Sequence, residues 1–302
     1  MTEVVYRAPA KVNLGLRCSS RRPDGYHNLI TVFMAVALAD TLTCTPLAGR
    51  VEVDVSGEGA NLIPTDGSDL TGRAATLLRD RFGDPGMGAR LVVDKAIPVA
   101  GGMAGGSADA AAALRACNDL WDLGVSEPDL MNLAADLGAD VPFALLGGVA
   151  LGVGRGDVLT PQPVRGTYHW VFALARHGLS TPEVFAKYDE MSHGDHDAAE
   201  LDDLIEVLTS GDASLLGAQL INDLTPAAVT LRPEIGETLA FGAALPGVVG
   251  SVLSGSGPTC AFLCDTEKAA DNAAARLPEL PQVASTRVAD GPVGGAGHRS
   301  RD

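Results

Sequence analysis

The chain has 302 residues, of which 46% are hydrophobic but only 4% aromatic, so aliphatic side chains must fill most of its core. Its formal net charge of −16 argues against a general nucleic-acid-binding protein, because phosphate backbones select basic surfaces. Five cysteines without a CxxC pair argue against a disulfide framework or a zinc site. The chain opens without a signal-peptide pattern and holds no apolar run long enough to span a bilayer. We therefore expect a cytoplasmic protein that binds neither nucleic acid nor membrane.

The first half of the chain predicts strands interleaved with helices. Residues 4–17 alternate between apolar and polar side chains, which is the period of a half-buried strand. A turn follows, in which residues 23–25 read Pro-Asp-Gly. Further strands are predicted over 27–38, 50–55 and 89–95, and helices over 69–81, 107–121 and 126–138.

A Pro/Gly-rich segment at 154–166 separates this region from a second pattern, and we place the domain boundary there, with domains at 1–157 and 158–290. Leaving out extra helices, the second domain reads β-α-β-β-α-β, which is typical of a ferredoxin-like sandwich. Its strands are expected over 168–175, 248–255, 258–264 and 283–289, and its last helix over 266–277. The tail 291–302 has little to bury and is predicted to be disordered.

The stretch "IPVAGGMAGGSADAAA" places a glycine-rich loop between a strand and a helix. Successive backbone N–H groups and a helix N-terminus together favour an anion, so a phosphate site is one interpretation and a flexible connector the other. The Walker A motif does not fit, because Gly106 is followed by Ser107 without a lysine. The dinucleotide fingerprint does not fit either, because the glycines are paired.

The loop closely resembles the phosphate loop of the GHMP kinases, a family that includes galacto-, homoserine, mevalonate and phosphomevalonate kinases. Three further segments, "APAKVNLGL" with "RPDGYHNL", "LGADVPFALLGG" and "LSGSGPTCAF", are similar to one branch of this family. That branch uses ATP to phosphorylate the 2-hydroxyl of 4-diphosphocytidyl-2-C-methyl-D-erythritol in the non-mevalonate route to isoprenoid precursors. The resemblance extends from about residue 6 to 288 and implies an α+β kinase fold, with the ATP loop in the N-terminal domain and a ferredoxin-like C-terminal domain.

The resemblance also implies a catalytic pair. The family's catalytic lysine falls on Lys11, and its neighbouring asparagine falls on Asn13, two residues along and therefore on the same face of the strand. The catalytic aspartate falls on Asp140, which would be the base, with Lys11 as its charge partner. Without the resemblance, the first two would be ordinary solvated strand positions and Asp140 a turn residue.

The acceptor site is implied by other segments. Tyr26 would stack on the cytosine of the acceptor and His27 would hydrogen-bond to it, whereas the alternative is a tyrosine packed under a hairpin and a loop histidine. Thr181 and Pro182 would lie near the acceptor. The turn 253–259 would support the phosphate loop, or would otherwise be a simple hairpin.

ATP is the implied co-substrate, with Mg²⁺. Ser107 is expected to cap its helix and to offer a hydroxyl to phosphate or Mg²⁺. Lys95 matches a neighbour of the adenosine, and Asp69 stands where the family usually has an asparagine that helps to hold it. An ionised aspartate accepts hydrogen bonds but donates none, which puts the usual contact in question. The loop residues expected around ATP are Pro98, Val99, Ala100, Gly101, Gly102, Met103, Ala104, Gly105, Gly106, Ser107 and Ala108.

Two other functions compete with this interpretation. Another GHMP kinase, acting on homoserine or mevalonate, would not need Tyr26 and His27 to hold a base. A non-catalytic ligand sensor on the same fold would not need Lys11 and Asp140. We expect a monomer or a weak homodimer, and no metal site in the charged segment "SHGDHD" at 192–197.

Overall fold

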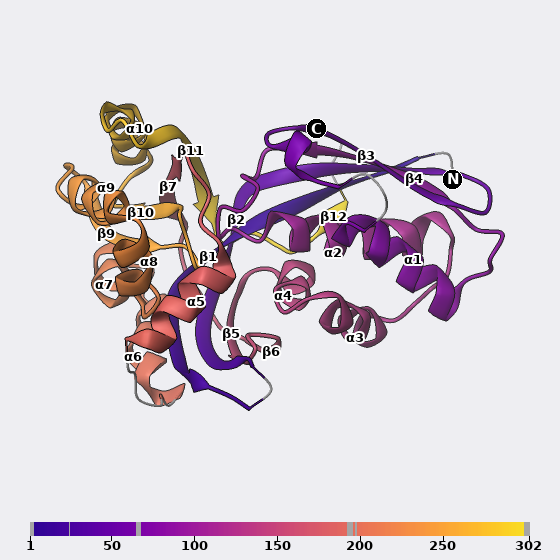
Figure 1. The fold of residues 1–302 in the computed structure, drawn as a ribbon, viewed down its shortest axis with the longest axis horizontal. Coiled ribbons are helices and arrows are strands. Elements are labelled where there is room, and N and C mark those ends of the chain that lie inside the picture. Colours follow the sequence, from indigo (N-terminus) through magenta and orange to yellow (C-terminus); the bar gives the residue numbers. More distant parts are fainter. Residues whose placement is uncertain (1–2, 24, 65–67, 192–195, 197, 299–302) are drawn as a thin grey trace.

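The computed structural model describes residues 3–298 apart from 24, 65–67, 192–195 and 197. Two long antiparallel strands, β1 (Val4–Arg21) and β2 (His27–Pro46), pair along most of their length and run between two lobes (Figure 1). The predicted strand at 4–17 is confirmed and is longer than expected.

The N-terminal lobe is a mixed sheet covered by helices. The sheet order is β12-β1-β2-β4-β3, with β5 paired to β2, β6 paired to β5, and β8 paired to β1. The helices gather beside this sheet in Figure 1, where α2 packs against β1 and β2. The remaining elements of this lobe are β3 (Val51–Gly57), η1 (Ala60–Leu62), α1 (Leu70–Phe82), β4 (Ala89–Lys95), α2 (Gly105–Leu120), α3 (Glu127–Leu137), α4 (Val141–Leu146), β5 (Val149–Gly154), β6 (Val158–Pro161), β8 (Ile221–Asn222) and β12 (Gly297–His298).

The C-terminal lobe is built on an antiparallel sheet of order β11-β7-β10-β9. If these four strands are numbered along the chain, their order across the sheet is 4-1-3-2. This order confirms the predicted ferredoxin-like arrangement. The elements are β7 (Tyr168–Ala175), α5 (Thr181–Glu190), η2 (Ala198–Leu201), α6 (Asp202–Leu208), α7 (Ala213–Gln219), α8 (Thr225–Leu231), α9 (Pro233–Ala243), β9 (Val248–Leu253), β10 (Cys260–Cys264), α10 (Glu267–Arg276), η3 (Leu277–Glu279) and β11 (Val283–Gly291).

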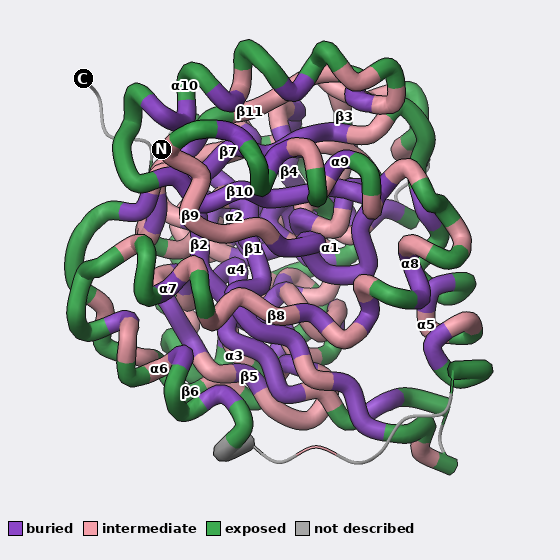
Figure 2. Tube along the Cα trace, turned by 90° about the vertical axis from the view of Figure 1, so that its left-hand side faces the viewer, coloured by how far each residue is buried: buried purple, intermediate pink, exposed green. Residues whose placement is uncertain are grey.

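Strand β7 joins the two hydrophobic cores. Its Trp170 and Phe172 pack into the core shared with the N-terminal lobe, whereas the alternate residues Val171 and Ala173 pack into the core of the C-terminal lobe. This alternation follows from the two-residue period of a strand. The two cores therefore meet at β7. Figure 2 shows the buried residues at the centre of the molecule and the exposed residues around its outside.

The chain's last residues correct one expectation. Residues 291–298 return to the N-terminal lobe, where β12 pairs with the edge of β1 and Gly294 bridges Gly147. The Nε2 atom of His298 lies 2.8 Å from Oδ2 of Asp119. The prediction of a disordered tail is therefore wrong for these residues, because a glycine-rich segment fits against the sheet edge; residues 299–302 lie outside the described part.

The boundary between the lobes also lies slightly beyond the expected one. Strand β6 follows residue 157 but pairs with β5 in the first sheet, so the chain enters the second sheet only at β7. In the described ranges, no helix is long and apolar enough to cross a membrane.

Candidate active site

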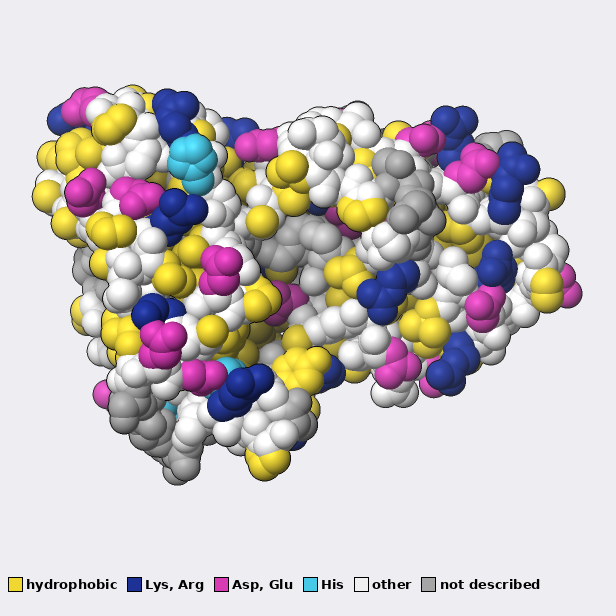
Figure 3. All heavy atoms as spheres, viewed as in Figure 1, with side chains coloured by type: hydrophobic (Ala, Val, Ile, Leu, Met, Phe, Trp, Pro, Cys, Tyr) yellow, Lys and Arg dark blue, Asp and Glu magenta, His cyan; other side chains and the backbone are white. Residues whose placement is uncertain are grey.

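Two connected cavities lie between the lobes, and the space-filling view shows the surface hollowed there (Figure 3). The first, of about 520 Å³, is lined by the glycine loop, Lys11 and Asp140, and we call it the phosphate-loop cavity. The second, of about 740 Å³, is lined by Tyr26 and His27, and we call it the Tyr26 cavity. Both are lined by Leu29, Ser107, Asp140, Arg155, Thr181 and Phe185, so they form one groove.

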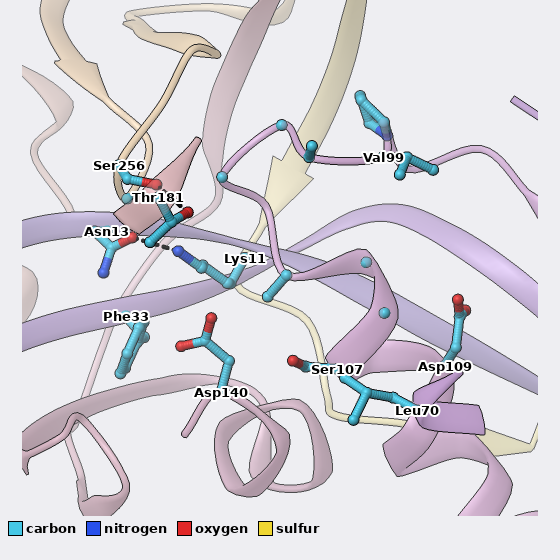
Figure 4. Close-up of a pocket in the computed structure, with 18 of the residues that line it drawn as sticks. Lys11, Asn13, Phe33, Leu70, Val99, Ser107, Asp109, Asp140, Thr181 and Ser256 are labelled. Atoms are coloured by element: carbon cyan, nitrogen blue, oxygen red, sulfur yellow. Dashed lines mark hydrogen bonds between the residues drawn. The ribbon is translucent and has the colours of Figure 1, made fainter. Parts of the chain in front are cut away.

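Helix α2 presents its N-terminus to the phosphate-loop cavity. The helix begins at Gly105 after Ala104, whose φ of 59° is left-handed, and its first hydrogen bond runs from the N–H of Ala108 to the carbonyl of Ala104 at 2.9 Å. The N–H groups of residues 105–107 therefore have no acceptor within the helix and can bind an anion. Ser107 is inside the first turn and does not cap the helix, contrary to the prediction. Its hydroxyl points into the cavity (Figure 4).

The turn 253–259 holds the glycine loop in place, as expected. The Ser254 hydroxyl donates to the carbonyl of Gly102 at 3.0 Å. Gly102 has a φ of +74°, and a Cβ there would lie 2.1 Å from the carbonyl oxygen of Ser254, so no other residue fits. Two loop residues face away from the groove, because Met103 and Ala108 are fully buried in the core. The other residues from Pro98 to Ser107 line the cavity.

Lys11 and Asn13 are both buried, at 5% and 2% exposure, and are not solvated strand positions. The Lys11 ammonium donates to Oδ1 of Asn13 at 2.6 Å, while the Asn13 amide donates to the Thr31 hydroxyl at 2.8 Å. Thr31 gives its own proton to the Gly15 carbonyl at 2.7 Å, so its oxygen must accept from Asn13. This chain fixes which end of the Asn13 amide faces Lys11.

Asp140 and Lys11 point into the same part of the groove from opposite sides (Figure 4). Asp140 precedes α4, and its carboxylate makes no capping hydrogen bond. Both residues are described, and no direct ion pair joins them, although burial lowers the pKa of Lys11 and the charge of Asp140 opposes that change. An acceptor group therefore has room between a carboxylate and an ammonium, as proton removal followed by attack on phosphorus requires.

Lys95 lies behind the loop in a buried charged cluster. Its ammonium donates to Asp40 and, at 2.5 Å, to Asp109 of α2. Asp40 also accepts the backbone N–H groups of Ala96 and Ile97 at 2.6 and 2.8 Å, which fixes the start of the loop. Burial raises the pKa of Asp109 to about 8. The positive charge of Lys95 opposes this increase, and the negative charge of Asp40 adds to it.

Asp69 caps helix α1, because its Oδ1 accepts the N–H of Gly72 at 3.0 Å. Its other oxygen, Oδ2, is buried without a hydrogen-bond partner in the described part of the chain, and the residue lines the phosphate-loop cavity. Asp69 therefore offers a ligand a hydrogen-bond acceptor, at a position where the family usually has the side-chain amide of an asparagine.

The Tyr26 cavity brings the predicted acceptor residues together. Tyr26 is exposed, at 56%, and forms one wall. His27 is buried, with Nε2 2.7 Å from Oδ1 of Asp189 and its ring stacked on Phe185 at 4.9 Å between centroids. Thr181 and Pro182 line the same cavity. The Asp24 of the predicted turn lies outside the described residues.

Several residues of the groove were missed from the sequence. Phe185 lies one helical turn after Thr181, so the period of α5 alone would have placed both on one face. Asp189 and Thr31 lie far in sequence from His27 and Asn13, which they contact, and Arg155 lies far from Tyr26. None of the three gave a signal in the sequence. For the segment 192–197, only His196 is described; in the part of the chain that the structure describes, no group of three His, Cys, Asp or Glu could hold a metal.

Comparison with known proteins gives consistent matches to both lobes. Residues 69–148 match the N-terminal domain of GHMP kinases, and residues 200–282 match their C-terminal domain. The 4-diphosphocytidyl-2-C-methyl-D-erythritol kinase of Nocardia farcinica is 51% identical over 97% of this chain and 95% of its own length. The protein of the same name from Thermobifida fusca is 50% identical over 98% of both chains. A crystal structure of 4-(cytidine 5'-diphospho)-2C-methyl-D-erythritol kinase superposes with a TM-score of 0.78 at 33% identity, over 96% of this chain and 100% of that one.

Proposed function

The chain belongs to the GHMP kinase family, and from this premise we propose that it transfers the γ-phosphate of ATP to the 2-hydroxyl of 4-diphosphocytidyl-2-C-methyl-D-erythritol. Relatives that match nearly the whole chain carry that activity in their names. The product would serve the non-mevalonate route to isoprenoid precursors.

The observation that carries the proposal is the continuity of the two cavities through Asp140. The glycine loop lines one, Tyr26 and His27 line the other, and Asp140 and Ser107 line both. A substrate that places a base beside Tyr26 and a hydroxyl beside Asp140 fits this arrangement. Mevalonate or homoserine would leave the Tyr26 cavity without a function.

The chemistry follows from the position of the charged groups. Asp140 removes the proton of the acceptor hydroxyl while its oxygen attacks the γ-phosphorus, and the leaving ADP oxygen departs on the opposite side. Lys11 and the N–H groups at the start of α2 offset the negative charge on the phosphoryl oxygens. Asn13 keeps the Lys11 ammonium directed into the groove.

The site also fits Mg²⁺, because the Ser107 hydroxyl and the phosphates of ATP would supply the oxygen ligands that this ion prefers. When bound, the ion neutralises phosphate charge. We assign Asp69 and Lys95 to the adenosine side of the groove: Oδ2 of Asp69 as an acceptor, and Lys95 through the cluster that fixes the loop.

We further propose a cytoplasmic enzyme, since all five cysteines are free and buried, and a monomer or weak homodimer.

A phosphate-transfer assay with Mg²⁺-ATP and a panel of acceptors tests the proposal. The cytidyl-diphosphate methylerythritol should be phosphorylated, whereas mevalonate, homoserine and galactose should not. Turnover of mevalonate or homoserine instead would assign the chain to another activity of the family. Binding of ATP and the cytidyl substrate without any transfer would mean that the protein is a ligand sensor.

A further inference from the structure

The acceptor of the proposed reaction carries a diphosphate, and the groove must hold that charge among acidic residues. Asp136, Asp140 and Asp189 all line the Tyr26 cavity. A carboxylate-lined cavity repels phosphate unless a cation lies along the path. A cation is needed between the base-binding end at Tyr26 and the reacting hydroxyl at Asp140.

Among the residues that the structure describes, four lysines and arginines line the groove: Lys11, Lys95, Arg21 and Arg155. The Lys95 ammonium is occupied by Asp40 and Asp109, and Lys11 lies at the point of transfer. Arg21 lines only the Tyr26 cavity, at the turn. Arg155 is the one basic residue in the described part of the chain that lines both cavities.

The side chain of Arg155 is held in a defined position. Its Nε and Nη2 donate to Oδ2 of Asp157 at 2.9 and 2.5 Å, and Nη2 also approaches the Ala135 carbonyl at 3.4 Å. Its guanidinium carbon lies 5.9 Å from the centre of the Tyr26 ring. Nη1 makes no hydrogen bond within the described residues, so both of its N–H groups are available to a ligand. The side chain is 37% exposed, so solvent reaches the guanidinium from the groove.

We propose that Arg155 binds the diphosphate bridge of the acceptor and thereby selects a nucleoside diphosphate conjugate over an acceptor that lacks this bridge. The inference rests on the proposed function. It follows from the presence of Arg155 in both cavities, from its position beside Tyr26, from its free Nη1, and from the carboxylates that line the Tyr26 cavity. A guanidinium suits this role because its planar array of donors matches phosphate oxygens.

The test compares the binding of cytidine and cytidine 5'-diphosphate by calorimetry, with the ATP site filled by a non-hydrolysable ATP analogue. In the wild-type protein, the diphosphate should bind more tightly than the nucleoside. Arg155→Met should weaken the diphosphate ~10–100-fold, the range typical of hydrogen bonds to charged groups, and leave cytidine nearly unchanged. Arg155→Lys should retain part of the preference. In turnover, Arg155→Met should raise KM for the acceptor far more than it lowers kcat.

Arg90→Met is the matched control, because Arg90 also pairs with an aspartate, Asp54, but lines neither cavity, and it should leave the preference unchanged. An unchanged preference in a folded Arg155→Met protein would overturn the inference, as would an equal loss of both ligands or a loss produced by Arg90→Met instead. Binding of the ATP analogue verifies that each variant is folded. If wild-type protein bound the analogue but neither cytidine nor its diphosphate, the proposed function itself would fail.

Discussion

Replacing Thr31 by Val tests the hydrogen-bond chain that directs Lys11. Thr31 is 1% exposed, and its hydroxyl accepts from Asn13 at 2.8 Å and donates to the Gly15 carbonyl at 2.7 Å. Valine has nearly the same volume, so little cavity forms, but a buried amide and a buried carbonyl each lose a partner. An unsatisfied buried group costs about 1–3 kcal/mol, so for two such groups we expect the free energy of unfolding to fall by about 2–6 kcal/mol.

The same change should reduce catalysis. Without Thr31 the Asn13 amide is free to turn, and Lys11 loses its fixed acceptor. Misplacement of a catalytic group by about 1 Å costs on the order of 100-fold, so we expect kcat to fall about 10- to 100-fold. Urea unfolding and steady-state kinetics measure the two effects.

Two variants make this result specific. Thr31→Ser keeps the hydroxyl and should recover most of kcat. Thr43→Val makes the same replacement in β2, at a hydroxyl without a hydrogen bond in the described part of the chain, and should change little. The reasoning is refuted if folded Thr31→Val protein keeps both wild-type kcat and wild-type stability.

Three further predictions test other parts of the site. Asp140→Asn should lower kcat ~10²–10⁴-fold, while both substrates bind within a few-fold of wild type. If the variant kept the wild-type kcat, Asp140 would have no catalytic role and would only form the turn. Gly102→Ala should weaken ATP binding by at least about tenfold or prevent folding, because its Cβ would lie 2.1 Å from the Ser254 carbonyl oxygen, whereas Gly294→Ala, with nothing within 4 Å of its Cβ, should do neither. Burial raises the pKa of Asp109 from 3.8 to about 8, so between these values the native state binds a proton that the unfolded chain lacks, and wild-type stability should fall as pH rises. Asp109→Asn should lack this dependence, which is at most about 1.4 kcal/mol per pH unit. Urea unfolding at pH 5 and pH 8 measures it, and an equal change in the free energy of unfolding in both proteins would contradict the assignment.

Local patterns predicted most of the secondary structure, because strands such as β7 and helices such as α3 carry a clear period and, for α3, a Ser126 cap. The predicted start of α2, at residue 107, differs from the observed start at Gly105, because the sequence does not reveal that Ala104 takes a left-handed conformation. The burial of Lys11 and Asn13 also escaped prediction. The strand pattern marks their face as polar, but in the fold Phe33 of β2 and Gly255 of the second lobe lie close to the Lys11 ammonium.

The site was predicted where motifs carry it and missed where tertiary contacts do. Lys11, Asp140 and Tyr26 lie in recognisable segments and line the groove, and their roles there stay predictions. Asp40, which fixes the start of the glycine loop, lies 56 positions before its backbone partner Ala96. The Arg155 guanidinium lies 5.9 Å from the centre of the Tyr26 ring, although the two residues are far apart in the sequence. Such long-range partners leave no local trace in a single sequence.

The return of the last strand to the first has a consequence for how the protein is made. Because β12 pairs with β1, this edge of the first sheet stays open until residues 297 and 298 have been synthesised. The short strand β8, contributed by the second half of the sequence, also pairs with β1. Expressed alone, the N-terminal half would lack both strands, so we expect it to associate through the exposed edge of β1.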